Sequence, residues 1–130
     1  MYFFLHIFLM TAATLSLIVG ISAAVFFRKK NNWLKIHKSF NSIALIVLCV
    51  GLLFIIIYIF EAGGKHLNGL HQLAGLAAFI FSGITMSVGF YQFKAKNKLA
   101  VRKTHRWLGR FSLLLLLTAI TLGLKLINLF

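Results

Sequence analysis

Four long apolar runs dominate this chain of 130 residues. They cover roughly residues 3–27, 39–60, 67–93 and 106–130. A helix needs about 20 apolar residues to cross about 30 Å of hydrocarbon, and each run is about that long or longer. Transmembrane β-strands would instead appear as short segments of alternating polarity. We therefore predict an all-α fold: an integral membrane four-helix bundle with antiparallel neighbouring helices and a single transmembrane domain over residues 1–130.

The basic residues are placed asymmetrically between these runs, although the net charge of +13 at first suggests nucleic-acid binding. Two connections are rich in lysine and arginine: the one between the first and second runs, and the one between the third and fourth runs with its flanks. The remaining connection, residues 62–68, carries one basic residue, Lys65, and follows Glu61. Cytoplasmic loops of membrane proteins collect positive charge. We expect both basic loops in the cytoplasm, both termini outside, and a bacterial inner membrane as the location. Anionic lipid headgroups of the bilayer, and not nucleic acid, are then the expected partner of the basic face, and docking of an anionic electron donor is the alternative. The basic residues on that face are Arg28, Lys29, Lys30, Lys35, Lys38, Lys94, Lys96, Lys98, Arg102, Lys103, Arg106 and Arg110.

The first run resembles a signal peptide only in its hydropathy. Its basic residues follow the run, whereas a signal peptide has them in front. We expect it to remain as a transmembrane helix. The single cysteine, Cys49, makes neither an intrachain disulfide nor a Cys-x-x-Cys-His haem attachment. It lies in the middle of the second run and is expected to be a small packing residue.

Four histidines lie at or near the starts of the apolar runs: His6, His37, His71 and His105. Alternate helix starts fall on opposite sides of a membrane, so His6 and His71 are expected near the outer face and His37 and His105 near the inner face. Such pairs suit a planar macrocycle that takes one axial nitrogen from each of two helices. His66 lies outside this pattern and is expected to be solvated, or else to replace His71 as a ligand.

A glycine follows two of these histidines by four residues: Gly75 after His71 and Gly109 after His105. Positions four apart share a helix face. A glycine there leaves room for a flat group beside the imidazole, although small residues also promote close helix packing. The distances from outer to inner histidine are similar in the two halves, which suggests a parallel internal repeat.

Two other functions fit the sequence less well. A proton-coupled multidrug exporter needs an acidic residue within the membrane, and the only acid, Glu61, lies at the end of a run. A histidine-based metal transporter would have two ligands per site, too few for a closed zinc site.

The ordered set of histidine motifs resembles the cytochrome b561 family, especially the four-helix core found beside DOMON domains. The similarity lies in the segment from His6 to Met10, in Trp33-x-x-x-His37, in His71-Gln-Leu-Ala-Gly75 and in His105-Arg-Trp-Leu-Gly109, and it covers nearly the whole chain.

This resemblance implies two non-covalent haem b groups, an outer one held by His6 and His71 and an inner one held by His37 and His105. It implies a transmembrane electron carrier that connects a cytoplasmic donor with an outer acceptor. The donor and acceptor stay open among quinol, ascorbate and a redox protein. A homodimer, or a small haem- or quinone-binding subunit of a larger respiratory or export complex, is the alternative arrangement.

Overall fold

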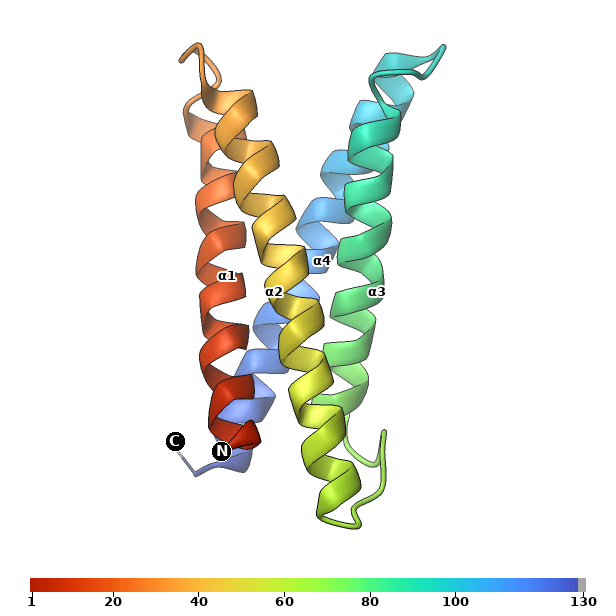
Figure 1. Cartoon of the computed structure of the whole chain (residues 1–130). Coiled ribbons are helices and arrows are strands. Elements are labelled where there is room, and N and C mark those ends of the chain that lie inside the picture. Colours follow the sequence, from red (N-terminus) through yellow and green to blue (C-terminus); the bar gives the residue numbers. More distant parts are fainter. Residues whose placement is uncertain (129–130) are drawn as a thin grey trace. The chain divides into compact units, whose positions relative to one another are not determined.

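The computed structural model describes residues 1–128, and four helices account for most of them (Figure 1). They are α1 (Tyr2–Phe26), α2 (Trp33–Glu61), α3 (Leu70–Tyr91) and α4 (Lys98–Leu126). Each is long and apolar enough to span a membrane. The predicted all-α fold, with four long apolar helices and neighbouring helices in contact, is confirmed.

The chain divides into two compact units, Met1–His66 and Leu67–Phe130. In the first unit α1 packs against α2, and in the second α3 packs against α4, so each unit is an antiparallel helical hairpin (Figure 1). Small residues such as Ala13, Ala44, Ala78 and Ala119 are buried at 0–4% exposure. Small side chains let helix backbones approach closely, which is the usual basis of helix packing in lipid.

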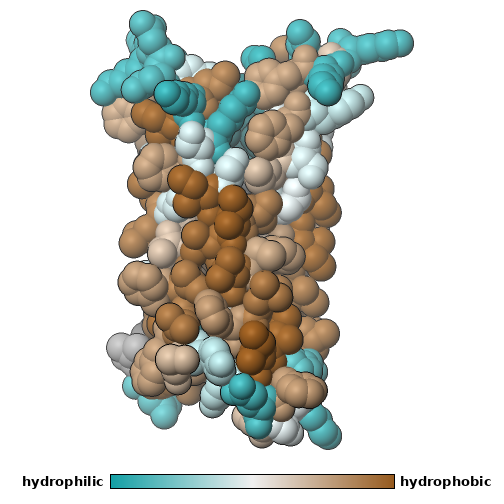
Figure 2. All heavy atoms as spheres, viewed as in Figure 1, coloured by the Kyte–Doolittle hydropathy of each residue, from teal (hydrophilic) through white to brown (hydrophobic). Residues whose placement is uncertain are grey.

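Large apolar side chains cover the outside of the helices. Phe4, Phe8 and Ile46 are among the many that are more than half exposed. Figure 2 shows hydrophobic residues over the middle of the helices and hydrophilic residues towards the helix ends. Exposed apolar surface of this extent suits hydrocarbon as the surrounding solvent.

The helices on the basic side begin before the apolar runs do. Helix α2 starts at Trp33 and α4 at Lys98, several residues ahead of the hydrophobic stretches at 39–60 and 106–130. Lysine and arginine are good helix formers. The first turns of α2 and α4 are therefore helical although their basic residues lie outside the apolar runs. Both His37 and His105 therefore lie within regular helix.

Helix α3 instead begins later than its apolar run, at Leu70. Leu67 has a φ of 57°, in the left-handed region, and Gly69 is extended at φ −161°. Neither conformation is helical, so α3 starts only after Gly69, one residue before His71.

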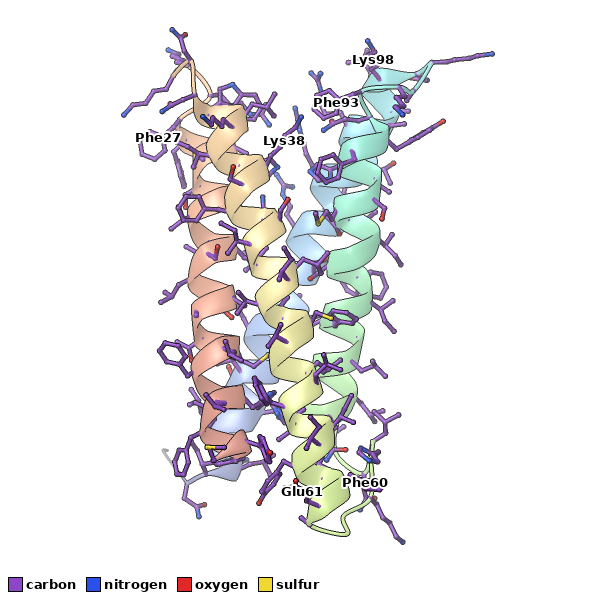
Figure 3. The ribbon with its side chains drawn as sticks, viewed as in Figure 1. Phe27, Lys38, Phe60, Glu61, Phe93 and Lys98 are labelled. Carbon is purple, nitrogen blue, oxygen red and sulfur yellow. The ribbon has the colours of Figure 1, made fainter. Side chains whose placement is uncertain are left out.

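Basic residues gather at one end of each hairpin. In the first unit, Lys38 lies at the end marked by Phe27, and Glu61 lies beside Phe60 at the opposite end (Figure 3). In the second unit, Lys98 lies with Phe93 at the connection between α3 and α4 (Figure 3).

Candidate cofactor site: four histidines on two hairpins

Each histidine of the first unit makes a hydrogen bond to the backbone of the other helix. The Nδ1 atom of His6 on α1 lies 2.9 Å from the carbonyl oxygen of Gly51 on α2. The Nδ1 atom of His37 on α2 lies 2.9 Å from the carbonyl oxygen of Gly20 on α1. The two bonds run in opposite directions between the same two helices, near the two ends of the hairpin.

The second unit repeats this arrangement. The Nδ1 atom of His71 on α3 lies 2.8 Å from the carbonyl oxygen of Ala119, and that of His105 on α4 lies 2.9 Å from the carbonyl oxygen of Thr85. The sequence separations are also similar, each longer by three residues in the second unit: 45 and 48 residues for the first histidine of each unit, and 17 and 20 for the second. The two hairpins therefore support the histidines in equivalent ways.

These four hydrogen bonds determine which imidazole nitrogen can bind a metal. A carbonyl oxygen only accepts, so Nδ1 must carry the proton in each bond. In a neutral imidazole with a proton on Nδ1, the lone pair that ligates a metal is on Nε2. A metal-binding histidine commonly donates its other N–H to a carbonyl, which fixes its tautomer and its orientation. All four side chains thus have the support that an axial ligand requires.

The two histidine levels within a hairpin are well separated. His6 is level with Gly51, and His37 is level with Gly20 on the same helix as His6. At a rise of about 1.5 Å per residue, the distance from His6 to Gly20 along α1 is about 21 Å. The same estimate applies from His71 to Thr85 along α3. Each hairpin therefore offers one histidine towards each end of its apolar layer.

His37 has an additional polar neighbour, Asn41, one turn further along α2. The Asn41 Nδ2 atom donates to the carbonyl oxygen of His37 at 2.8 Å and lies 2.9 Å from the His37 Nδ1 atom. Since Nδ1 gives its proton to the carbonyl of Gly20, it has no lone pair in the ring plane to accept from the amide N–H of Asn41, so the amide packs against the ring without donating to it. The Oδ1 atom of Asn41 is buried and has no hydrogen-bond partner among the described residues.

All four imidazoles donate to backbone carbonyl oxygens and none to a hydroxyl group. Nearby hydroxyl groups bond elsewhere. Thr104 donates to Ala100, and Ser112 bonds to Leu108 and to Thr85. Backbone acceptors on a neighbouring helix carry no sequence signal of their own, which is why sequence analysis did not identify them.

The two glycines proposed to accommodate a flat group differ in their surroundings. A Cβ atom at Gly75 would meet no atom within 4 Å, whereas one at Gly109 would lie 3.7 Å from Cγ2 of Thr85. Gly75 therefore leaves open space beside His71, and Gly109 lies close to α3. The role of both residues beside a cofactor stays a prediction.

Two other glycines, which sequence analysis did not assign to the site, contact the imidazoles directly. A Cβ atom built on Gly123 would lie 2.8 Å from Cε1 of His71, and one built on Gly89 would lie 2.8 Å from Cε1 of His105. Both follow the acceptor residue, Ala119 or Thr85, by four positions. Their spacing from the acceptor becomes visible only when the hydrogen bonds are known.

The predicted ligand pairs, His6 with His71 and His37 with His105, each join a residue of one unit to a residue of the other. The pairing stays a prediction. His66 is exposed in the connection that follows α2. Among residues 1–128, no group of three or more histidine, cysteine or acidic side chains forms a metal cluster.

Comparison with known proteins supports one family. The family model described as eukaryotic cytochrome b561 matches residues 1–130. No curated protein and no solved structure gives a significant match. The match extends over the whole chain, including both hairpins and all four supported histidines, so the protein belongs to the cytochrome b561 family of transmembrane haem b electron carriers.

Proposed function

We propose that this protein binds two haem b groups and carries electrons across the membrane between a cytoplasmic donor and an outer acceptor. The outer haem is held by His6 and His71, and the inner haem by His37 and His105. Haem iron with two axial histidines takes up and releases single electrons.

The observation that carries this proposal is the set of four Nδ1–H···O=C hydrogen bonds, 2.8–2.9 Å long, from one helix of a hairpin to the other. Each bond selects the tautomer with its lone pair on Nε2, and each limits rotation of the ring. Four oriented imidazoles, one towards each end of each hairpin, are the number and kind of ligands that two bis-histidine haems need. Gly75, with open space beside His71, suits a flat neighbour at the outer level.

The protein supplies ligands, orientation and a low-dielectric setting. Two axial histidines leave no open position on the iron, so electron transfer is favoured over oxygen chemistry. The separation of about 21 Å between histidine levels spreads the two haems over the two leaflets. The basic ends beside His37 and His105 are proposed to face the cytoplasm, which follows from the positive-inside rule.

Histidine variants of the purified protein test the proposal. His6→Ala and His71→Ala should each remove the same low-spin b-type component from the reduced-minus-oxidised spectrum. His37→Ala and His105→Ala should each remove the other component. His66→Ala, which changes an exposed histidine outside the set, is the matched control and should retain both. If His71→Ala and His105→Ala lost the same component, the proposed pairing would be wrong.

A further inference from the structure

The histidines of the second hairpin differ from those of the first in what lies against the ring. At Gly123 on α4, the three atoms nearest to an added Cβ all belong to the His71 imidazole: Cε1 at 2.8 Å, Nδ1 at 3.1 Å and Nε2 at 3.6 Å. At Gly89 on α3, they all belong to the His105 imidazole, at 2.8, 3.1 and 3.5 Å for the same atoms. The two contacts agree to within about 0.1 Å.

The place of each glycine relative to the hydrogen bond explains this agreement. His71 donates to Ala119 and lies against Gly123, one turn further along the same helix. His105 donates to Thr85 and lies against Gly89, again one turn further. The imidazole therefore lies over one turn of the neighbouring helix, with Nδ1 at the carbonyl and Cε1 at the glycine.

The first hairpin has no glycine one turn beyond the acceptor carbonyl. There the acceptors themselves are glycines, Gly51 for His6 and Gly20 for His37. The residues one turn beyond them are Ile55 and Ala24, both of which have side chains. Among the four histidines, only His71 and His105 thus have a glycine one turn beyond the residue that accepts their hydrogen bond.

We infer that Gly123 and Gly89 are positioning residues, which set the ring orientation of His71 and His105 as axial ligands of the outer and inner haem. This inference rests on the proposed function. A methyl group at either position would come within 3.0 Å of the imidazole, closer than real Cβ contacts. The ring lies at the end of a flexible side chain, so the ring will move and the helix backbone will stay. Moving the ring changes the direction of Nε2 and weakens the Nδ1 hydrogen bond.

The test compares Gly123→Ala and Gly89→Ala with two controls in the purified, haem-loaded protein. Gly83→Ala on α3 adds a methyl group that meets no atom within 4 Å. Thr121→Ala on α4 removes an exposed hydroxyl that donates to the carbonyl oxygen of Leu117 on its own helix. The readouts are the low-spin electron paramagnetic resonance signals, which report the relative orientation of the axial imidazoles, and the two midpoint potentials.

Gly123→Ala is expected to shift the resonance signal and potential of the outer haem only, and Gly89→Ala those of the inner haem only. Both controls should retain the signals of the unmodified protein. Unchanged signals in Gly123→Ala and Gly89→Ala, or equal changes at both haems, would overturn the inference. An unmodified protein that bound no haem would overturn the proposed function instead, so the two failures are distinguishable.

A double variant covers the case in which Gly123→Ala does not accumulate. If the methyl group acts only through the imidazole, His71→Ala removes its target, and His71→Ala with Gly123→Ala should accumulate and retain the inner haem as well as His71→Ala alone does. A double variant as defective as Gly123→Ala would show that the glycine serves helix packing, and the positioning role would be rejected.

Discussion

Support of a histidine by a backbone carbonyl recurs at all four positions, but the residue that provides the carbonyl differs. Gly20 and Gly51 provide it in one hairpin, and Thr85 and Ala119 in the other. Any residue type presents the same carbonyl oxygen. The histidines could therefore be recognised from sequence by their spacing, whereas their acceptors required the packing of one helix on another.

Gly51 illustrates how closely the helices approach beside a histidine. A Cβ atom there would collide with the methyl end of Met10 and lie 3.2 Å from Cβ of Leu9. We expect Gly51→Ala to destabilise the first hairpin by about 1–3 kcal/mol relative to a helical Gly→Ala change without close contacts, because the Cβ atom of Leu9 cannot swing aside as the Met10 methyl group can. Thermal unfolding in detergent would measure this, with Gly83→Ala as control because Gly83 also lies inside a helix and a Cβ atom there meets nothing within 4 Å. Equal stability of the two variants would contradict the close approach.

At the scale of the helices, hydropathy predicts which residues lie in the apolar layer, but it does not predict the residues at which a helix begins. The runs at 39–60 and 106–130 omit the basic first turns of α2 and α4, because lysine and arginine favour helix as well as water. The opposite error occurs before α3, where Leu67 adopts a positive φ inside a stretch that is apolar by composition. Neither boundary depends on hydropathy, so an analysis of apolar runs could not place it.

The start of α4 depends on a side-chain cap. The Oδ1 atom of Asn97 accepts a hydrogen bond from the backbone N–H of Ala100 at 3.1 Å, whereas Asn32 at the start of α2 makes no such side-chain bond. Replacing a capping asparagine with alanine costs about 1 kcal/mol. Asn97→Ala should therefore lower thermal stability and speed amide hydrogen exchange in the first turns of α4. Asn32→Ala is the matched control, and an equal effect of both variants would argue against the cap.

At the scale of the whole molecule, the chain repeats one arrangement in two hairpins, each with one histidine towards each of its ends. The similar sequence separations of the histidine–carbonyl bonds support this repeat. The distribution of charge gives the hairpins a direction. Basic residues lie at the ends beside His37 and His105, and the segment around Lys65 is near neutral.

This direction predicts which loops face the cytoplasm. In a Cys49→Ala background, Lys29→Cys should be protected from a membrane-impermeant thiol reagent added outside, and Lys65→Cys should react with it. The expectation follows from the positive-inside rule. Labelling in the opposite pattern would reverse the proposed donor and acceptor sides without affecting the histidine ligands.

The central claim is that four supported histidines hold two haems. The most direct measurement is the number of haems per chain in the purified protein, determined from the pyridine haemochromogen and a quantitative amino-acid analysis. The account predicts about two non-covalent b-type haems per chain, because bis-histidine ligation uses two imidazoles for each iron. A fully folded protein that contained one haem or none would contradict it.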